Sequence, residues 1–437
     1  MDNWFDSISI SLIRLPLWIL SAFLISSCSL ERPSFEGIPA RGKKMALFFD
    51  GTNNTMYGPK HTHTNIVKMY EAVKPGTQKF YIEGVGANRK ILGLATGFGF
   101  RYRIMKGYRF IAENYADGNE IYLFGFSRGA YSARMLSNFL YTVGLLDLSA
   151  VPHDKRDVFL RKLYQAYHKK QGGLVEKRIA AQTFLDRWNA ERKNPQVATK
   201  ADRLDVAAMG LFDSVEALGW PDYTEEDFRN LPATDLPQLE NVGMTFHALA
   251  LDDRRANIFT PMLFGTKETD NHTTRPLKDK LEEVWFSGCH LDVGGGVDKK
   301  FTDNAKFPLR WMLSRFKHYD LFTPVDISTP VLPPLNDIME ASHWKLLYKG
   351  KNRSIENYLM EAMAANASSK LLIHRSVLER LQTPGKLPDF KHRSNHKKAL
   401  DWYENKYFKS CFTRNTVTGA YTLNRNCLSI KVVNDTP

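Results

Sequence analysis

The residues best suited to chemistry form a Gly-x-Ser-x-Gly pattern, in which Gly125 and Gly129 flank Ser127. An apolar run that starts at Ile121 leads into this pattern, and a segment compatible with a helix, Ala130–Leu146, follows it. A strand, a tight turn and a helix in this order expose a nucleophilic serine at the carboxyl edge of a sheet. Glycines are needed beside the serine because a Cβ there would collide with the neighbouring strand or helix. We predict that Ser127 is a nucleophile, the alternative being a glycine-rich turn with a chance serine.

A nucleophilic serine needs a base that takes its proton and an acid that orients the base. In α/β-hydrolases these groups follow in the chain order Ser, Asp or Glu, then His, each after a strand. Asp213 follows the apolar run 204–212, and His290 follows the apolar run 283–286 after a short loop. We therefore predict a catalytic triad of Ser127, Asp213 and His290.

The developing oxyanion of acyl transfer needs N–H donors. The first donor predicted here is the N–H of Arg128, the residue after the serine. The second is a backbone N–H of Gly51 or Thr52, in the loop that follows the first predicted strand, 44–49.

Other acids and bases lie close to these positions in the sequence. Asp50 ends the first strand and has either a structural role, in an Asx turn, or a functional one. Asp252 is a second strand-end carboxylate, and Asp292 lies two residues after His290. His247 falls in the middle of an apolar run and is interpreted as a core histidine or a neighbour of the site. We place Asp50, His247 and Asp292 around the triad.

The sequence gives little indication of a metal site. It contains neither CxxC nor HExxH, and the pair His61 and His63 is a weak metal signal by itself. The glycine-rich loop at 93–99 lacks the lysine and the spacing of a phosphate-binding loop. We expect no metal and no cofactor.

The remaining pattern alternates strands with helices, which predicts a mostly parallel sheet flanked by helices, as in α/β-hydrolases. Strands are expected at 44–49, 78–82, from 120, at 204–212, 242–251 and 283–286, and helices at 64–73, 101–115 and 307–317. Residues 151–202 are polar and basic, and we interpret them as a helical cap inserted between strands. We assign 44–320 to the hydrolase domain and 321–437 to a helical accessory region.

The amino terminus is predicted to lie outside this fold. The mostly apolar run 15–25 is too short to span a bilayer and is typical of a signal peptide. Small residues precede Cys28, as in the lipobox of bacterial lipoproteins. We predict a signal peptide over 1–28, lipidation of Cys28 and a tether over 29–43, which gives a membrane-anchored lipoprotein facing the periplasm. An uncleaved signal anchor is the alternative.

Composition narrows the class of partners. The chain has 437 residues, 43% hydrophobic and 24% charged, and a formal charge of +13. These proportions are those of a globular protein, and the positive charge suits an anionic bilayer. No nucleic-acid-binding motif accompanies the charge, so we expect a phospholipid surface and no nucleic acid. Cys411 and Cys427 either form a disulfide or stay reduced and buried, and Cys289 is a small core residue.

Four blocks of this sequence resemble a known family, the α/β-hydrolase domain of the first family of type VI secretion lipase effectors and its relatives. They are Leu47-Phe-Phe-Asp-Gly-Thr-Asn53, Gly125-Phe-Ser-Arg-Gly-Ala-Tyr-Ser-Ala-Arg134, Gly210-Leu-Phe-Asp-Ser-Val215 and Trp285-Phe-Ser-Gly-Cys-His-Leu-Asp-Val-Gly-Gly295. The segment 247–255 is similar as well, and the resemblance covers about residues 44–320. It implies a phospholipase of the A type, with an immunity or secretion-system protein as a partner. Two alternatives stay open, a general esterase and a non-catalytic lipoprotein that binds a partner.

Overall fold

A computed structural model describes residues 42–84, 98–169, 173–191, 196–215, 241–253, 280–296, 303–325, 369–383 and 408–435, with single positions between them. The chain divides into two units, Met1–Arg41 and Gly42–Pro437, and all described residues belong to the second. The predicted signal peptide, Cys28 and most of the tether lie outside the described residues. In the described part no helix is long and apolar enough to cross a membrane.

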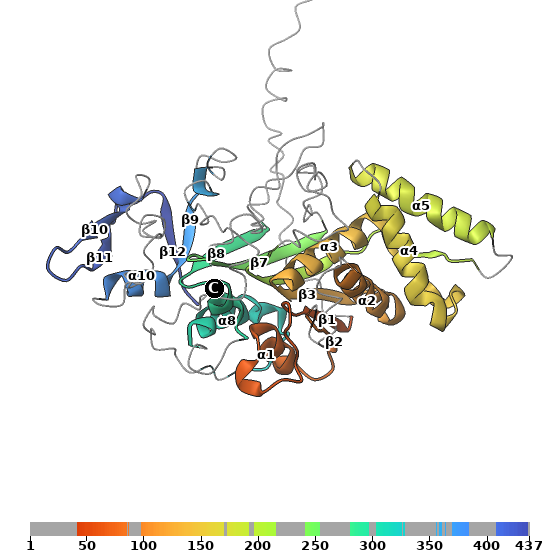
Figure 1. The fold of residues 1–437 in the computed structure, drawn as a ribbon, viewed down its shortest axis with the longest axis horizontal. Coiled ribbons are helices and arrows are strands. Elements are labelled where there is room, and N and C mark those ends of the chain that lie inside the picture. The colour runs from red at the N-terminus through yellow and green to blue at the C-terminus, as the bar shows by residue number, and fades with distance from the viewer. Residues whose placement is uncertain are drawn as a thin grey trace, which may run out of the picture. The chain divides into compact units, whose positions relative to one another are not determined.

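An eight-stranded sheet forms the centre of the second unit (Figure 1). Its strand order is β12-β9-β8-β7-β6-β3-β1-β2, and every pair in it is parallel. The strands are β1 (Lys44–Phe49), β2 (Gln78–Ile82), β3 (Glu120–Phe126), β6 (Val206–Phe212), β7 (Val242–Ala250), β8 (Leu281–Phe286), β9 (Leu371–His374) and β12 (Ile430–Val433). The parallel sheet confirms the predicted α/β-hydrolase-like class, and its carboxyl edge carries the loops that follow β1, β3, β6 and β8.

Helices cover both faces of the sheet, as the alternation of buried side chains in the strands requires. Met45, Leu47 and Phe49 of β1 pack with α2 (Phe98–Asn114) and α3 (Arg128–Val143). Ala46 and Phe48 point to the other face and pack with the second group of helices. This group comprises α1 (Asn65–Ala72), α7 (His290–Gly294) and α8 (Asp303–Arg315), and the short turn η8 (Lys317–Tyr319) follows α8. The predicted helices 64–73, 101–115 and 307–317 therefore correspond to α1, α2 and α8.

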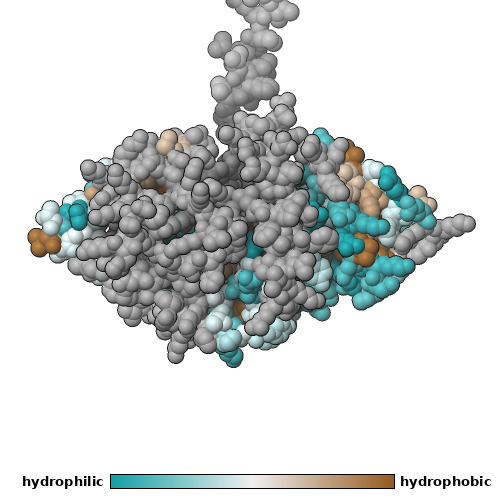
Figure 2. Space-filling view, in the orientation of Figure 1, coloured by the Kyte–Doolittle hydropathy of each residue, from teal (hydrophilic) through white to brown (hydrophobic). Residues whose placement is uncertain are grey.

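The predicted helical insertion between β3 and β6 contains α4 (Arg156–Lys169) and α5 (Leu174–Ala190) (Figure 1). It leaves and rejoins the sheet through the antiparallel pair β4 (Leu145–Leu146) and β5 (Thr199–Ala201). Arg178 donates hydrogen bonds to the carbonyl oxygens of Thr142 and Tyr141, at the last turn of α3. The insertion also packs on α2, where Arg109 pairs with Asp157 of α4, and on the middle of α3, where Asn138 donates to the hydroxyl oxygen of Tyr167 at 3.2 Å. Figure 2 shows a largely hydrophilic surface on the insertion, although Val175 and Ile179 are exposed.

Residues after 320 differ from the helical accessory region that we predicted. The described part contains one longer helix, α10 (Arg375–Gln382), but also four strands, and two of these, β9 and β12, extend the central sheet. The other two, β10 (Phe412–Arg414) and β11 (Tyr421–Leu423), form a hairpin. Each strand has only three or four residues, too few for a period to be recognised in the sequence.

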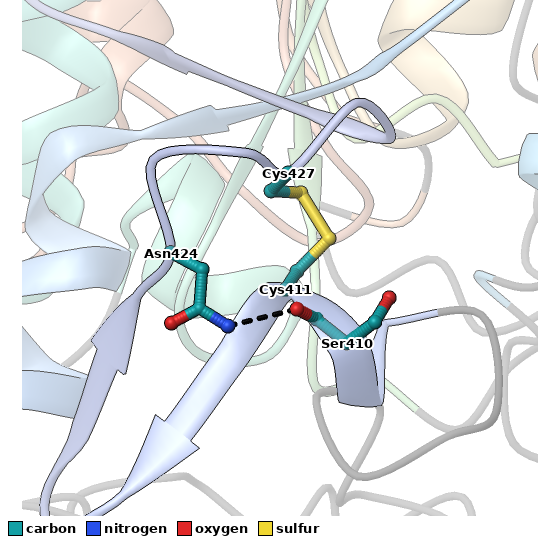
Figure 3. Close-up of a disulfide and its surroundings, with 4 residues drawn as sticks. All are labelled: Ser410, Cys411, Asn424 and Cys427. Atoms are coloured by element: carbon teal, nitrogen blue, oxygen red, sulfur yellow. Dashed lines mark hydrogen bonds between the residues drawn. A yellow bond between two sulfur atoms is a disulfide. The ribbon is translucent and has the colours of Figure 1, made fainter.

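A disulfide joins Cys411 and Cys427 beside this hairpin, where Asn424 also donates to the carbonyl oxygen of Ser410 at 2.8 Å (Figure 3). Cys411 lies in a short turn, η13 (Lys409–Cys411), and is buried with Tyr358 and Ile373 in a separate apolar cluster. Of the two states considered for these cysteines, the structure has the oxidised one. Cys289 is a buried free cysteine, as predicted.

Reduction of this disulfide should destabilise the protein by about 3 kcal/mol, because the bond closes a loop with a sequence separation of 16 residues. Urea unfolding with and without a reducing agent measures the change in the free energy of unfolding. The double variant Cys411→Ser/Cys427→Ser is the control, since it keeps Cys289 and should not respond to the reducing agent. An equal response of both proteins would contradict the prediction.

Candidate active site

Ser127 occupies a strained turn between β3 and α3. Its φ is 58° and its ψ is −129°, a backbone conformation that non-glycine residues rarely adopt. A Cβ on Gly125 would lie 2.5 Å from the Cα of Ala130, and a Cβ on Gly129 would lie 2.1 Å from the carbonyl oxygen of Phe49. Main-chain atoms cannot move aside, so both glycines are required for α3 to approach the sheet, as the sequence pattern predicted.

The neighbouring strand β6 fixes the position of this turn. The N–H of Ser127 donates to the carbonyl oxygen of Phe212 at 3.0 Å, and its carbonyl oxygen accepts from Val215 at 3.3 Å. Phe212 and Val215 lie on either side of Asp213 in the sequence. The backbone of the predicted nucleophile is therefore bonded to the loop that carries the predicted acid.

Asp213 and His290 are hydrogen-bonded to each other. His290 Nδ1 lies 2.6 Å from Asp213 Oδ2, and both side chains are buried. The other carboxylate oxygen of Asp213 accepts from the N–H of Ala250 at 2.9 Å. The ring centroid of His290 lies 4.6 Å from that of Phe126, the residue before Ser127. The structure thus places the three predicted residues at the carboxyl edge of the sheet, with Asp213 and His290 in direct contact.

Carboxylates after β7 hold the main chain around His290. Asp252 Oδ2 accepts from the N–H of Gly288 at 2.6 Å, and Asp253 Oδ2 accepts from the N–H of His290 at 3.1 Å. Asp252, which competed with Asp213 in the sequence, therefore serves the histidine loop. The sequence did not assign a role to Asp253, although two carboxylates at the end of a predicted strand were a visible signal.

Asp292 belongs to the same loop and binds its main chain. Its Oδ2 accepts from the N–H of Cys289 at 2.8 Å, which begins the short helix α7. Its Oδ1 accepts from Asn304, whose side-chain oxygen in turn accepts from Arg380 of α10. Burial raises the pKa of Asp292. These contacts fit the predicted place of Asp292 near the triad and connect the histidine loop to the carboxyl-terminal part of the chain.

His247 is fully buried and engaged at both ring nitrogens. Nδ1 lies 2.8 Å from Glu283 Oε1, and Nε2 accepts from the N–H of Ser214 at 3.1 Å. Tyr358 donates to the second oxygen of Glu283 at 2.8 Å. Because Ser214 follows Asp213, this bond holds the loop after β6 that carries Asp213. The position of His247 agrees with its interpretation as a core residue beside the site.

The loop after β1 lies against the first turn of α3. Thr52 Oγ1 accepts a hydrogen bond from Arg128 Nε, so two of the three predicted oxyanion residues are in contact. The N–H of Gly51, however, donates to Asp50 Oδ1 at 2.7 Å. This bond removes Gly51 from the predicted donors and leaves the N–H groups of Arg128 and Thr52 as the proposed pair.

Asp50 organises this loop from a fully buried position. Its carboxylate accepts from the hydroxyl groups of Thr64 and Tyr81 as well as from the N–H of Gly51. Arg103 donates to its carbonyl oxygen. Burial dominates over these donors and raises the pKa of Asp50 to about 6. Within the described ranges, no group of three or more histidine, cysteine or carboxylate side chains could hold a metal ion.

The raised pKa of Asp50 predicts a loss of stability as the pH rises from 4 to 6. In this window the folded protein keeps a proton that the unfolded chain, with a pKa near 3.8, has lost. Each pKa unit corresponds to about 1.4 kcal/mol, so the contribution is on the order of 3 kcal/mol. Urea unfolding of the wild type and of Asp50→Asn at several pH values measures it. A stability difference between the two proteins that stays constant from pH 4 to 7 would contradict the prediction.

The close approach of α3 predicts that Gly129→Ala lowers the free energy of unfolding by roughly 1–3 kcal/mol. The new methyl group would meet the carbonyl oxygen of Phe49 at 2.1 Å. Gly58→Ala is the matched control, because its nearest neighbour, Thr62 Oγ1, would lie at an ordinary 3.5 Å. Equal unfolding midpoints of the two variants would show that the helix can move away from β1.

Comparison with known proteins identifies the family of this chain. Residues 43–315 match the family described as "T6SS, Phospholipase effector Tle1-like, catalytic domain". The "Uncharacterized protein YEL023C" of Saccharomyces cerevisiae is 26% identical over 251 residues, 52% of this chain. The chain spans only 34% of the length of that relative.

Two solved structures share weaker similarity. An uncharacterized protein from Pseudomonas aeruginosa is 15% identical, with a TM-score of 0.40 over 76% of this chain and 51% of the other. The apo form of Thermogutta terrifontis esterase 2 is 12% identical, with a TM-score of 0.29 over 66% of this chain and 88% of the other. The family match, by contrast, covers Ser127, Asp213 and His290 together with the loops that carry them. The chain therefore belongs to the family of Tle1-like phospholipase effector catalytic domains.

Proposed function

We propose that Ser127, His290 and Asp213 form a catalytic triad that hydrolyses the acyl esters of glycerophospholipids, a phospholipase A activity. The observation that carries this proposal is the hydrogen bond of 2.6 Å between His290 Nδ1 and Asp213 Oδ2, next to a serine on a strained turn. A buried carboxylate at Nδ1 fixes the tautomer of the imidazole and leaves Nε2 as the base.

The reaction follows from these positions. Nε2 of His290 takes the proton of Ser127 while Oγ attacks the ester carbonyl carbon, and the imidazolium is stabilised by Asp213. The N–H groups of Arg128 and Thr52 donate to the oxyanion of the tetrahedral intermediate. When this intermediate collapses, the leaving alkoxide receives the proton from Nε2. His290 Nε2 then takes a proton from a water molecule while the water oxygen attacks the acyl carbon bound to Ser127. Collapse of this second intermediate returns the proton to Ser127 Oγ and releases the fatty acid.

Three features support a phospholipid as the substrate. The description of the family to which the chain belongs names phospholipase effectors. The formal charge of +13 favours the surface of an anionic bilayer. The predicted signal peptide over 1–28, with lipidation at Cys28, would hold the enzyme on a membrane facing the periplasm. An immunity or secretion-system protein is the protein partner that the family suggests, and we propose no nucleic-acid partner.

Removal of the nucleophile should abolish the activity. We expect Ser127→Ala to lower the release of fatty acid from phospholipid vesicles on the order of 10⁴-fold or more, since the members of a triad act as a unit. Ser149→Ala is the control, because Ser149 is exposed in the short turn η3 (Leu148–Ala150), which follows α3 and β4. Fatty-acid release by the full-length protein and both variants is the measurement.

Labelling by a fluorophosphonate separates the remaining readings of the site. This probe requires an activated serine and does not depend on the substrate. Labelled Ser127 without fatty-acid release would retain the hydrolase and replace the phospholipid by another ester. Unlabelled Ser127 in folded protein would overturn the triad in favour of a binding protein.

A further inference from the structure

Arg103 is a buried cation that the proposed mechanism does not use. It lies on α2 and is 3% exposed, and its Nη2 donates to the carbonyl oxygen of Asp50 at 2.5 Å. Nε and Nη1 are also buried, and neither has a hydrogen-bond partner among the described residues. Of the five N–H donors of a guanidinium, the three on Nε and Nη1 of Arg103 are therefore without a hydrogen-bond partner in the described part of the chain.

The carboxylate of Asp50 attracts this charge through space, but it accepts no hydrogen bond from Arg103. Arg103 contacts the main chain of Asp50, whereas the carboxylate oxygens accept from Gly51, Thr64 and Tyr81. Burial is the main cause that lowers the pKa of Arg103 to about 10. The negative charge of Asp50 opposes this shift, and the positive charge of Arg128 adds to it. At neutral pH Arg103 is therefore charged, incompletely hydrogen-bonded and close to a second cation.

Both cations contact the loop after β1, against which the start of α3 packs. Arg128 is the first residue of this helix, and its Nε donates to Thr52 on the loop after β1. The carbonyl oxygen of Asp50 that Arg103 contacts would lie 2.6 Å from a Cβ on Gly129, two residues after Ser127. The positive end of a helix of 16 residues adds to the field at this point.

We infer that Arg103 and Arg128 form an anion site beside Ser127 that binds the phosphodiester of a glycerophospholipid. A buried cation without full hydrogen bonding is costly, and an anionic ligand offsets this cost. The planar fork of a guanidinium matches the oxygens of a phosphate group. A glycerophospholipid carries its phosphodiester and its acyl esters on one glycerol, so a single molecule could occupy both the anion site and the triad. This inference rests on the proposed function and adds that the protein recognises the phosphodiester of the substrate.

The test compares two substrates with the same acyl chains, dioctanoyl-phosphatidylcholine and dioctanoylglycerol, which lacks the phosphate. We expect Arg103→Met to lower the ratio of their kcat/KM values roughly 10- to 100-fold, the range for loss of hydrogen bonds to a charged group. Arg109→Met is the matched control, since Arg109 lies on the same helix and pairs with Glu113 and Asp157. Its ratio should equal that of the wild type. An unchanged ratio in Arg103→Met overturns the inference.

Competition keeps the test independent of the phospholipase activity and of how the variant folds. Glycerophosphocholine should inhibit hydrolysis of dioctanoylglycerol by the wild type, and inhibition should be weaker in Arg103→Lys, which keeps the charge but loses the fork. If the wild type hydrolyses dioctanoylglycerol but not phosphatidylcholine, the proposed substrate fails while inhibition by glycerophosphocholine still supports the anion site. Equal inhibition by inorganic phosphate indicates a site for free phosphate and overturns recognition of the lipid. Absence of inhibition by both compounds overturns the site itself.

Discussion

The contact between the first turn of α3 and the carboxyl end of β1 is the constraint on which the site depends. Gly129 lets the helix approach the carbonyl oxygens of Phe49 and Asp50 so closely that no side chain fits between them. The same approach forces Ser127 into its positive φ and places it against the end of β6, to which its backbone is bonded. The positions of Ser127, of the loop after β1 and of the loop that carries Asp213 therefore follow from one close contact between main chains.

Carboxylates at the ends of the strands carry out a second common task, the binding of backbone N–H groups in loops. Asp50, Asp252, Asp253 and Asp292 each accept from an N–H in the loop after β1 or β8. Buried N–H groups must be hydrogen-bonded, and a loop has no neighbouring strand to supply carbonyl oxygens. The cluster of acidic residues around the proposed triad thus has a structural explanation, and Asp213 differs from the others because its second oxygen contacts the imidazole of His290.

The parts of the fold that could be predicted are those with local signals. The elbow is fixed by two glycines around a serine, and the pairing of Asp213 with His290 follows from strand order in a parallel sheet. The engagement of the Gly51 N–H could not be predicted, because it depends on the rotamer of the neighbouring Asp50 side chain. Arg103 lies in an amphipathic pattern in which arginine usually faces water, so its burial depends on tertiary packing. β9 and β12 join the sheet across long stretches of chain, a pairing that no local pattern encodes.

The position of β12 in the sheet has a consequence for the order in which the site is assembled. β12 pairs with β9, which is followed directly by α10, and Arg380 of α10 reaches the histidine loop through Asn304 and Asp292. A ribosome releases the nucleophile and acid loops long before it releases these residues. The support of the His290 loop is therefore completed only after Arg380 has left the ribosome, when the loops that carry Ser127 and Asp213 are already exposed.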